Sequence, residues 1–364
     1  MTDKPKPKKC LYFRSDNSVH GYLRTVLPFE TIKMSNFEDF VLEETTFRTF
    51  TIDELRNVDA VWFQRFFGPM ELNAAHEMYR LHRALGFRMV YDIDDLIFDT
   101  EVGNGLPDYN DCRKNFTKEI QATALDAMKL MDVVSVSTEY LGKFLASEMG
   151  VTAKMEVIPN ALPRAYYGNI NLKPMNEVPK KIKVVYIGAH QHFSNEDKMP
   201  GDWSPAWIEW LRKGIAEDRI EFSTITQCPY FLDDMKGKVR QLGPVPFYMY
   251  HHAVRSADAD ICINPLKDNQ FNSCKSDLAL LTCSASGIVC VGTTFKSRNV
   301  SPFDHGFANV LDTDTAEQID EKIRSFLQPV RRMKIIQSQV DFMNSGRWME
   351  STEHMRTILK VLFG

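Results

Sequence analysis

The feature that most constrains the fold is one stretch of 33 residues, 259–291. An apolar run that ends at residues 261–263 leads into a polar loop, a helical pattern and a second apolar run at residues 288–291. Short apolar runs with polar flanks are typical of buried strands, and Leu278 and Leu281 recur at the spacing of one helix face. A strand, a helix and a strand of this length predict a right-handed crossover between two parallel strands.

Residues at both ends of the helical pattern suit helix termini. Ser273 or Ser276 can cap the start, Asp277 suits the first turn, and Gly287 follows the last turn. The sequence therefore predicts one helix between the two strands.

Lys275 does not fit the start of a helix. A cation there opposes the helix dipole, whereas an anion is stabilised by the free backbone N–H groups. A bound anion beside Lys275 would resolve the conflict, because ligands of open parallel sheets lie beyond the carboxyl ends of the strands, where residues 265–276 form the loop. The alternative is an exposed lysine in a frayed first turn, and the local sequence leaves both open.

The rest of the chain alternates strand and helix patterns. The predicted strands are residues 10–13, 58–63, 88–91, 133–136, 155–160, 183–187 and 220–225. The predicted helices are residues 22–34, 72–85, 116–131, 139–149 and 348–363. This alternation is typical of parallel α/β sheets, and residues 162–180, with three prolines and little periodicity, separate two such regions. We expect domains at residues 1–165 and 182–345, a linker at 166–181, and a C-terminal helix at 346–364 that packs back toward the first domain.

The composition is that of a globular protein with two cores. The chain has 364 residues, 44% of them hydrophobic and 25% charged. Its net charge of −4 offers no general attraction to nucleic acid, so any such contact must come from local basic patches. The first residues are polar and basic, and no apolar stretch approaches the length of a membrane span. We expect a cytoplasmic protein without a membrane partner.

The seven cysteines include no Cys-x-x-Cys spacing. Cys262 and Cys290 lie in apolar strand patterns. The sequence therefore predicts reduced, buried thiols rather than disulfides or a zinc site.

The stretch around Lys275 resembles a known family in its motif residues. Pro265-Leu266-Lys267-Asp268, Phe271-Asn272, Lys275-Ser276-Asp277 and Gly287-Ile288-Val289 are similar to the donor-binding segment of group 1 glycosyltransferases with the GT-B fold. Further similar pieces are residues 61–65, 90–95, 134–140, 157–160 and 184–188. The resemblance implies an α/β fold of two Rossmann-like domains that face a central cleft.

The same resemblance implies a nucleoside-diphosphate sugar as co-substrate, with UDP as the expected nucleotide and no cofactor or metal. In this family the loop and the helix start hold the diphosphate, which assigns Lys275 to phosphate neutralisation and Asn272, Ser273 and Ser276 to donor binding. Family members usually carry a glutamate five residues before the glycine, where it holds the donor ribose. This sequence has Thr282 at that donor-binding position, and here it departs from the family pattern.

Asp92, Asp94 and Asp95 follow directly on an apolar strand pattern, so they lie at its carboxyl end. Three carboxylates there could bind a metal, orient sugar hydroxyls or act as a base. The alternative is a solvated loop in which one Asp caps the next helix. We assign Asp94 to catalysis and Asp92 and Asp95 to the acceptor side, without a metal, because the resemblance is to a fold that generally works without one.

His20 and Arg24 follow the first predicted strand, and Arg65 follows the second. The resemblance places the loop with His20 and Arg24 against the acceptor and the donor phosphates, with Arg65 as a cation at the cleft rim. We assign His20 and Arg24 to the acceptor side and Arg65 to catalysis. The alternative is that both arginines are surface residues.

Gly188, His190 and His192 lie in the loop that opens the second domain. A glycine turn there could let backbone amides approach a phosphate, with a histidine as a further donor. Exposed loop histidines or a metal site are the alternatives, although no cysteine or carboxylate lies at ligand spacing. Phe247 could stack on the donor nucleobase or belong to the core.

These features predict a glycosyltransferase, hexosyl- or pentosyltransferase, that moves a sugar from a nucleoside-diphosphate sugar to an acceptor hydroxyl, with retention of stereochemistry if the group 1 resemblance holds. The Asp-Ile-Asp-Asp and Phe-Asn-x-x-Lys-Ser combination resembles glycosyltransferases of tailed bacteriophages, some of which modify hydroxymethylated pyrimidines in DNA. The first acceptor hypothesis is therefore 5-hydroxymethylcytosine in double-stranded phage DNA, in the host cytoplasm. The alternatives are a bacterial surface-polysaccharide or protein glycosyltransferase and a non-catalytic sugar-nucleotide-binding module.

Overall fold

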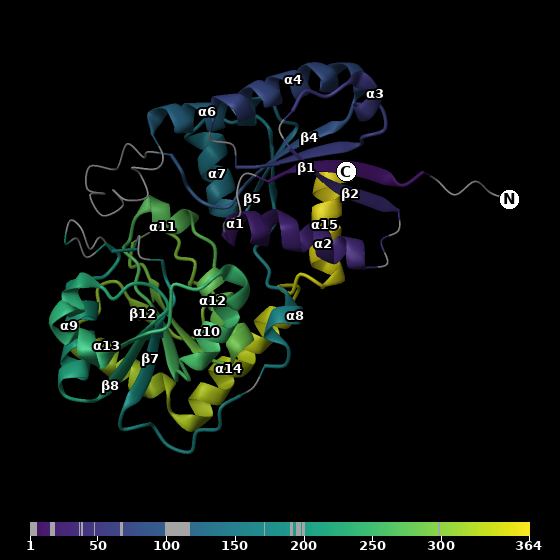
Figure 1. The fold of residues 1–364 in the computed structure, drawn as a ribbon. Coiled ribbons are helices and arrows are strands. Elements are labelled where there is room, and N and C mark those ends of the chain that lie inside the picture. Colours follow the sequence, from purple (N-terminus) through teal and green to yellow (C-terminus); the bar gives the residue numbers. More distant parts are fainter. Residues whose placement is uncertain are drawn as a thin grey trace.

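The computed structural model shows two α/β units, one above the other in Figure 1, joined by two crossings of the chain. It describes residues 6–14, 19–35, 37, 39–46, 48–65, 68–98, 117–170, 172–189, 192–193, 198, 201–297 and 299–364. Each unit is built on a six-stranded sheet whose paired strands run parallel. The predicted fold class, α/β with two Rossmann-like domains, is therefore confirmed.

The sheet of the first domain has the strand order β2-β1-β3-β4-β5-β6. Its strands are β1 (Lys8–Phe13), β2 (Phe40–Thr45), β3 (Ala60–Gln64), β4 (Arg88–Ile93), β5 (Val133–Val136) and β6 (Lys154–Val157). β3 and β4 lie in the middle of the sheet and are buried except at Arg88. Burial on both faces is the reason that these strands read as apolar runs.

Helices cover both faces of this sheet. One face carries α4 (Pro69–Leu85), α6 (Lys118–Lys129) and α7 (Glu139–Ser147), and the other carries α2 (Leu27–Met34) and α15 (Thr352–Phe363). Shorter elements are α1 (Val19–Gly21), the π-helix η1 (Tyr22–Val26) and α3 (Ile52–Leu55). The C-terminal helix α15 thus contributes to the core of the first domain.

The sheet of the second domain has the order β12-β11-β10-β7-β8-β9. Its strands are β7 (Ile182–Tyr186), β8 (Ile220–Thr224), β9 (Val239–Gln241), β10 (Ile261–Asn264), β11 (Val289–Thr294) and β12 (Asn309–Leu311). Because β7 lies between β8 and β10, the chain reverses its direction across the sheet at this point. Open α/β sheets bind ligands beyond the carboxyl ends of the strands at such a switch point.

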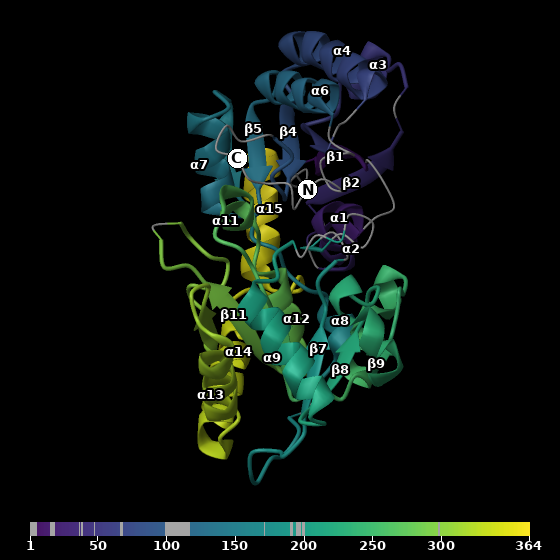
Figure 2. The ribbon, with the colours of Figure 1, turned by 90° about the vertical axis from the view of Figure 1, so that its left-hand side faces the viewer.

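The second sheet is also covered on both faces. α9 (Pro205–Ala216), α13 (Ala316–Phe326) and the 3-10 helix η4 (Tyr230–Lys238) share one core, and α10 (Tyr250–Ser256) and α12 (Leu278–Ser286) share the other. α14 (Pro329–Asn344) packs against α12 and α13. The short helix α11 (Gln270–Cys274) lies on the side that faces the first domain (Figure 2), and Phe247 of the short helix η5 (Phe247–Met249) stacks on Tyr22 of that domain.

The two crossings between the domains are bonded to each other. The first crossing follows β6 and contains α8 (Arg164–Tyr167), and the second follows α14. The N–H of Leu162 donates to the carbonyl of Arg347 at 3.1 Å, and the N–H of Met349 donates to the carbonyl of Leu162 at 3.0 Å. These backbone hydrogen bonds join the two crossings through a short parallel β-bridge between Leu162 and Trp348.

The stretch 259–291 forms the predicted parallel pair, with Ile261 of β10 opposite Val289 of β11. The predicted helix is present as α12, but it is not the single helix between the two strands, because a second, shorter helix, α11, lies within the predicted loop at residues 265–276. Asn269 caps α11 by accepting the N–H of Asn272, and residues 275–277 form a link that belongs to neither helix.

The predicted helix ends are correct only in part. Ser273 lies inside α11, Ser276 lies in the link, and Asp277 is the residue before α12 without capping it through its side chain. Gly287 ends α12 as predicted, with a φ of +70°, a left-handed conformation that glycine adopts freely.

Two further features concern the cysteines and the helices that the structure describes. Six cysteines are buried and form no disulfide, namely Cys10, Cys228, Cys262, Cys274, Cys283 and Cys290, whereas Cys112 lies outside the described residues. In the described part of the chain, no helix is both long enough and apolar enough to cross a membrane.

Candidate functional site

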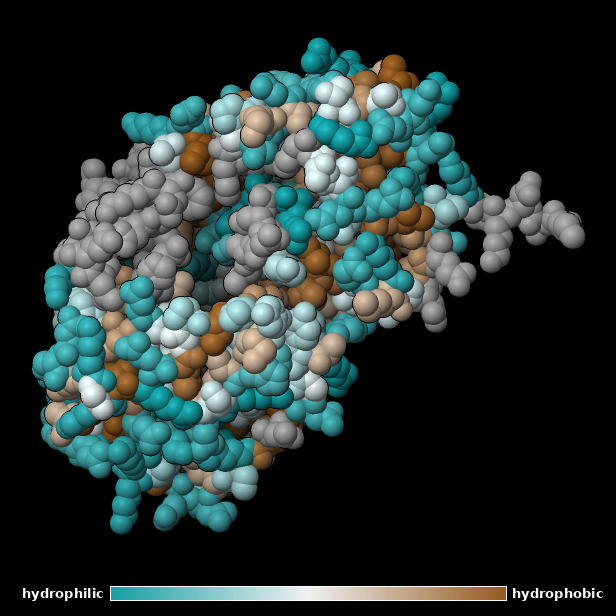
Figure 3. Space-filling view, in the orientation of Figure 1, coloured by the Kyte–Doolittle hydropathy of each residue, from teal (hydrophilic) through white to brown (hydrophobic). Residues whose placement is uncertain are grey.

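A cavity of about 430 Å³ lies between the two domains, and Figure 3 shows a hollow at this level of the molecule. The first domain contributes residues that follow β1, β4 and β6, and the second contributes residues that follow β7, β8 and β10 and residues that begin α12. The carboxyl ends of both sheets therefore face the same cavity. This is the place where parallel α/β sheets bind their ligands.

The switch point of the second domain forms one wall of the cavity. Gly188 follows β7, and Asn264 and Pro265 lie at the end of the neighbouring strand β10. A Cβ atom at position 188 would lie 2.3 Å from the hydroxyl oxygen of Tyr186, whose side chain is buried beneath this turn. The turn therefore requires glycine because no room exists for a side chain.

Lys275 lines the cavity from the link between α11 and α12. Its ammonium group lies 4.6 Å from the ring centroid of Phe271. Among the residues that the structure describes, no carboxylate lies within ion-pair distance of Lys275. Lys275 is thus a cation at the cavity without an ion-pair partner among the described residues.

Of the other residues predicted to hold the diphosphate, only Ser276 lines the cavity. Asn272 and Ser273 are buried behind it. The N–H of Asn272 donates to the side-chain oxygen of Asn269 at 2.8 Å, and the N–H of Ser273 donates to the backbone carbonyl of Asn269 at 3.1 Å. These two amides therefore serve the first turn of α11 and do not face the cavity.

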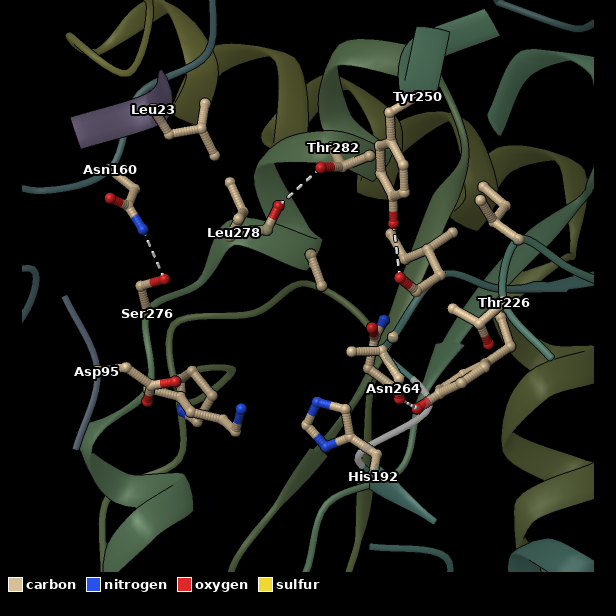
Figure 4. Close-up of a pocket in the computed structure, with 18 of the residues that line it drawn as sticks. Leu23, Asp95, Asn160, His192, Thr226, Tyr250, Asn264, Ser276, Leu278 and Thr282 are labelled. Carbon is tan, nitrogen blue, oxygen red and sulfur yellow. Dashed lines mark hydrogen bonds between the residues drawn. The ribbon is translucent and has the colours of Figure 1, made fainter. Parts of the chain in front are cut away.

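A largely apolar wall continues from the switch point, and Figure 4 shows part of it. The hydroxyl of Tyr250 donates to the carbonyl of Ile187 at 2.6 Å, and the hydroxyl of Thr282 donates to the carbonyl of Leu278 at 2.9 Å. Phe247 lines the cavity and stacks on Tyr22 of the first domain, with ring centroids 6.1 Å apart. Phe247 therefore belongs to the contact between the domains as well as to the cavity wall.

His192 lines the cavity beside the switch point. Its Nδ1 lies 2.5 Å from a carboxylate oxygen of Asp202, which is fully buried and also accepts a hydrogen bond from the side chain of Asn272 at 2.7 Å. The ring of His192 is therefore oriented by a fixed carboxylate. His190, the other histidine predicted for this site, lies outside the described residues.

On the first domain, Asp94 brings two predicted residues together. One of its carboxylate oxygens lies 2.7 Å from Nδ1 of His20, and the other lies 3.0 Å from Nε of Arg65. Burial alone would raise the pKa of Asp94, but the charges of Arg65 and His20 hold this pKa far below its usual range. Asp94 therefore stays ionised and orients His20, which lines the cavity.

Arg24 and Asp92 form a buried ion pair behind this wall. Nη2 and Nε of Arg24 lie 2.6 and 3.1 Å from the two carboxylate oxygens of Asp92, and the hydroxyl of Ser135 donates to Asp92 at 2.6 Å. Burial would lower the pKa of Arg24, but the carboxylate of Asp92 outweighs it and raises this pKa. Neither residue lines the cavity.

The alternative that Arg24 and Arg65 are surface residues is wrong, because both side chains are buried in ion pairs. Arg65 also does not lie at the rim of the cavity, but behind Asp94. Of the three aspartates, Asp94 and Asp95 line the cavity and Asp92 does not.

Asn160 lines the cavity, although its sequence pattern predicted no role for it in the site. Its side-chain oxygen accepts a hydrogen bond from Arg24 at 3.1 Å, and its amide nitrogen donates to the hydroxyl of Ser276 at 2.8 Å. The available signal was a polar residue, after Pro159, at the end of a predicted strand. Within the described part of the chain, no group of three or more His, Cys, Asp or Glu residues could hold a metal ion.

Comparison with known proteins finds similarity in structure but not in sequence. No protein-family model and no curated protein matches the sequence. The structure of Anabaena HepE in complex with UDP and glucose matches with a TM-score of 0.57 at 10% identity, over 98% of this chain and 99% of that one. An α-glucosyltransferase in complex with UDP and a 13-mer DNA that contains an HMU base matches with a TM-score of 0.56 at 10% identity, over 99% and 100%.

The β-glucosyltransferase of phage T4 matches with a TM-score of 0.52 at 12% identity, over 98% of this chain and 99% of that one. The three matches extend over both domains and the crossings. This chain therefore has the two-domain GT-B fold that these three proteins share.

Proposed function

We propose that this protein transfers a sugar from a UDP-sugar to an acceptor hydroxyl. The observation that carries the proposal is Lys275, a cation without a carboxylate partner among the described residues, beside the switch point of a Rossmann-like sheet. A diphosphate supplies the anion that this position lacks. Structures with the same fold have been solved with UDP, which supports this donor class.

In the proposed reaction the second domain binds the donor. The diphosphate lies against Lys275 and the turn at Gly188, and the nucleoside lies against the wall of Phe247, Tyr250 and Thr282. As the bond between sugar and diphosphate breaks, negative charge grows on the leaving phosphate, and Lys275 stabilises it.

The first domain presents the acceptor hydroxyl. His20 and Asp95 lie on the acceptor side of the cavity, and Asp94, Arg65, Arg24 and Asp92 hold this side rigid through ion pairs. Closure of the two domains around the donor would exclude water, which otherwise competes as a nucleophile. The stereochemistry that accompanies the group 1 resemblance is retention, and in a front-face reaction the leaving phosphate itself accepts the proton of the acceptor.

The first acceptor that we propose is 5-hydroxymethylcytosine in DNA. The support is the fold that the chain shares with an α-glucosyltransferase solved with modified DNA and with the T4 phage enzyme. Such an acceptor requires contacts between local lysines or arginines and DNA phosphates, and it requires the base to leave the stack. Binding to DNA should then weaken steeply as salt rises.

A second acceptor class, a carbohydrate or protein hydroxyl, is favoured by the charge of the acceptor side. Residues 1–165 contain 20 lysines and arginines against 25 aspartates and glutamates, a net charge of −5. This balance repels a polyanion, whereas a neutral acceptor is unaffected. A non-catalytic sugar-nucleotide-binding module would share the donor site and transfer nothing.

A donor screen tests the proposal. The purified protein is incubated with a panel of nucleoside-diphosphate sugars, with and without DNA that contains hydroxymethylcytosine, and released nucleotide and DNA mass are measured. We expect UDP release from a UDP-sugar and a gain of one sugar mass per modified base. UDP release without a DNA gain would leave the transferase and remove the DNA acceptor, whereas donor binding without release would indicate the binding module.

A further inference from the structure

We infer that the first domain positions Lys275, and that Thr138 and Asn160 are positioning residues for transfer. The inference rests on the proposed function, since it takes Lys275 as the group that neutralises the leaving diphosphate. It assigns a role to two residues outside the donor domain that carries this lysine.

Lys275 cannot be held by its own helix. It follows α11, which has only five residues, and its own backbone is extended. Ser276 and Asp277 separate it from α12. A helix of this length has no stability of its own, because helix nucleation is unfavourable. The place of the ammonium group therefore depends on what fixes the residues on either side of it.

The residues before Lys275 are fixed by the first domain. The side chain of Cys274 is completely buried in the core cluster of the first domain, and Phe271 packs against the same cluster. α11 lies beside α7 in Figures 1 and 2, and the two helices are in contact. The hydroxyl of Thr138, the residue before α7, donates to the carbonyl of Cys274 at 3.1 Å.

The residues after Lys275 are fixed by the crossings. The side-chain nitrogen of Asn160 donates to the hydroxyl of Ser276 at 2.8 Å, while Nε of Arg347 donates to the carbonyl of Asn160 at 3.0 Å. The same arginine binds both carboxylate oxygens of Asp277, at 2.8 and 2.5 Å. The side-chain oxygen of Asn160 accepts from Arg24 at 3.1 Å, so this asparagine links the ion pairs of the first domain to the donor loop.

Every residue next to Lys275 is therefore bonded to a group outside the donor domain. Thr138 holds the residue before it, Asn160 holds the residue after it, and Arg347 holds the next one. Separation of the domains would break these bonds and release the lysine. Phosphate neutralisation then occurs only while the domains are docked, which protects the donor from hydrolysis in an open protein.

Thr138 allows a test that separates positioning from stability. Its hydroxyl accepts the N–H of Leu141 at 3.2 Å, which caps α7, and donates its own hydrogen to Cys274. Thr138→Ser keeps both bonds. Thr138→Asp keeps the cap, since Asp is a good N-cap residue, but an ionised carboxylate has no hydrogen to donate. We expect Thr138→Asp to lower kcat about tenfold with a smaller change in KM for the donor, and Thr138→Ser to retain most of the wild-type kcat.

A double-mutant cycle shows whether Thr138 acts through Lys275. In the Lys275→Ala background, Thr138→Asp should cause little further loss of kcat, because the group that it positions is gone. Asn160→Leu, which conserves volume without a polar atom, should show the same dependence on Lys275. An equal loss in both backgrounds would overturn the inference.

The docking itself can be measured without any substrate. Alkylation of Cys274 in the intact protein, followed by peptide mass spectrometry, reports how often α11 leaves the first domain, and the buried Cys10 serves as an internal control. Thr138→Asp should raise the labelling rate of Cys274 severalfold relative to Thr138→Ser and leave Cys10 unchanged. Equal labelling in the two variants would contradict the docking step. A wild-type protein that releases nucleotide from no donor would instead refute the proposed function, and the labelling result would still stand.

Discussion

The two walls of the cavity differ in how their charges are balanced. On the first domain, Asp94 faces His20 and Arg65, and Asp92 faces Arg24, so these two buried carboxylates each have a cation beside them. On the second domain, Lys275 has no carboxylate partner among the described residues, and the surrounding wall is largely apolar. The buried charges of the first wall are thus paired with one another, whereas the cation of the second wall has no such partner among the described residues.

This difference separates positioning from binding. Buried ion pairs do little for net stability, but each partner becomes costly when the other is removed, so they hold groups in fixed places. An unpaired cation at a cavity is instead available to a ligand. The comparison therefore predicts that changes on the first wall mainly affect stability and geometry, while changes on the second mainly affect donor binding and catalysis.

The largest expected effect is that of Lys275→Ala on catalysis. Removal of the cation that stabilises the leaving diphosphate should lower kcat by ~10²–10³-fold. The measurement is the rate of nucleotide release at saturating donor. Lys296→Ala, at an exposed lysine of the same domain, is the matched control and should leave the rate unchanged. Equal rates of nucleotide release in the two variants would show that Lys275 does not stabilise the leaving diphosphate.

The next effect is that of Asp92→Asn on stability. The buried guanidinium of Arg24 would lose its counter-charge, and breaking such a pair costs about 3–5 kcal/mol in the free energy of unfolding. Calorimetry should show a lower melting temperature. Asp126→Asn removes an exposed pair with Lys129 and should cost less than about 0.5 kcal/mol. A stable Asp92→Asn protein would mean that the first wall is not held by its ion pairs.

Gly188→Ala should weaken donor binding without removing any charge. The new Cβ would lie 2.3 Å from the hydroxyl oxygen of Tyr186, whose ring packs on Trp203 and cannot move freely. We expect a loss of about tenfold in affinity for UDP from displacement of the turn. Gly237→Ala adds a Cβ with no atom within 4 Å and serves as the control. Unchanged affinity in Gly188→Ala would remove this turn from the donor site.

The smallest effect concerns His354, which lies behind the first wall. Burial, together with the charges of Arg24 and Arg347, lowers the pKa of His354 to about 3. Because this pKa is depressed in the folded protein, the contribution is complete above the usual pKa of about 6.5 and is lost as pH falls toward the folded value. Between pH 7.5 and pH 5.5 the wild-type protein should lose ~1 kcal/mol of stability through this group.

The matching experiment compares urea unfolding at the two pH values. His354→Leu should lack this part of the pH dependence, while the rest of the curve stays the same. An unchanged pH dependence in the variant would show that His354 takes up its proton as readily in the folded protein as in the unfolded protein.

Much of the fold could be predicted from local sequence patterns. The central strands β3, β4, β5 and β10 are buried on both faces, and such strands are recognisable as apolar runs. β2 escaped prediction because its sequence, Phe-Val-Leu-Glu-Glu-Thr, belongs to a half-exposed edge strand. The short helix α11, which lies within the predicted loop at residues 265–276, also could not be seen locally, because contacts with the first domain, such as Thr138 to Cys274, hold it.

The candidate site was predicted less completely than the fold. Lys275 was identified because it conflicts with the dipole of the helix that it precedes, which is a local signal. The ion-pair partners of Arg24 and Arg65 could not be identified from the sequence. Asp92 lies in β4 and Asp94 directly follows it, whereas the two arginines lie in other parts of the chain, and no local rule pairs them. The role of Asn160 depends on three groups from both domains, and such a convergence exists only in the folded protein.

The most direct measurement is calorimetric titration of the protein with UDP and with uridine. If the second wall binds a diphosphate through Lys275, UDP should bind at least about tenfold more tightly than uridine, and Lys275→Ala should largely abolish this difference. Equal affinities for UDP and uridine in the wild-type protein, or a UDP preference that survives in Lys275→Ala, would contradict the account.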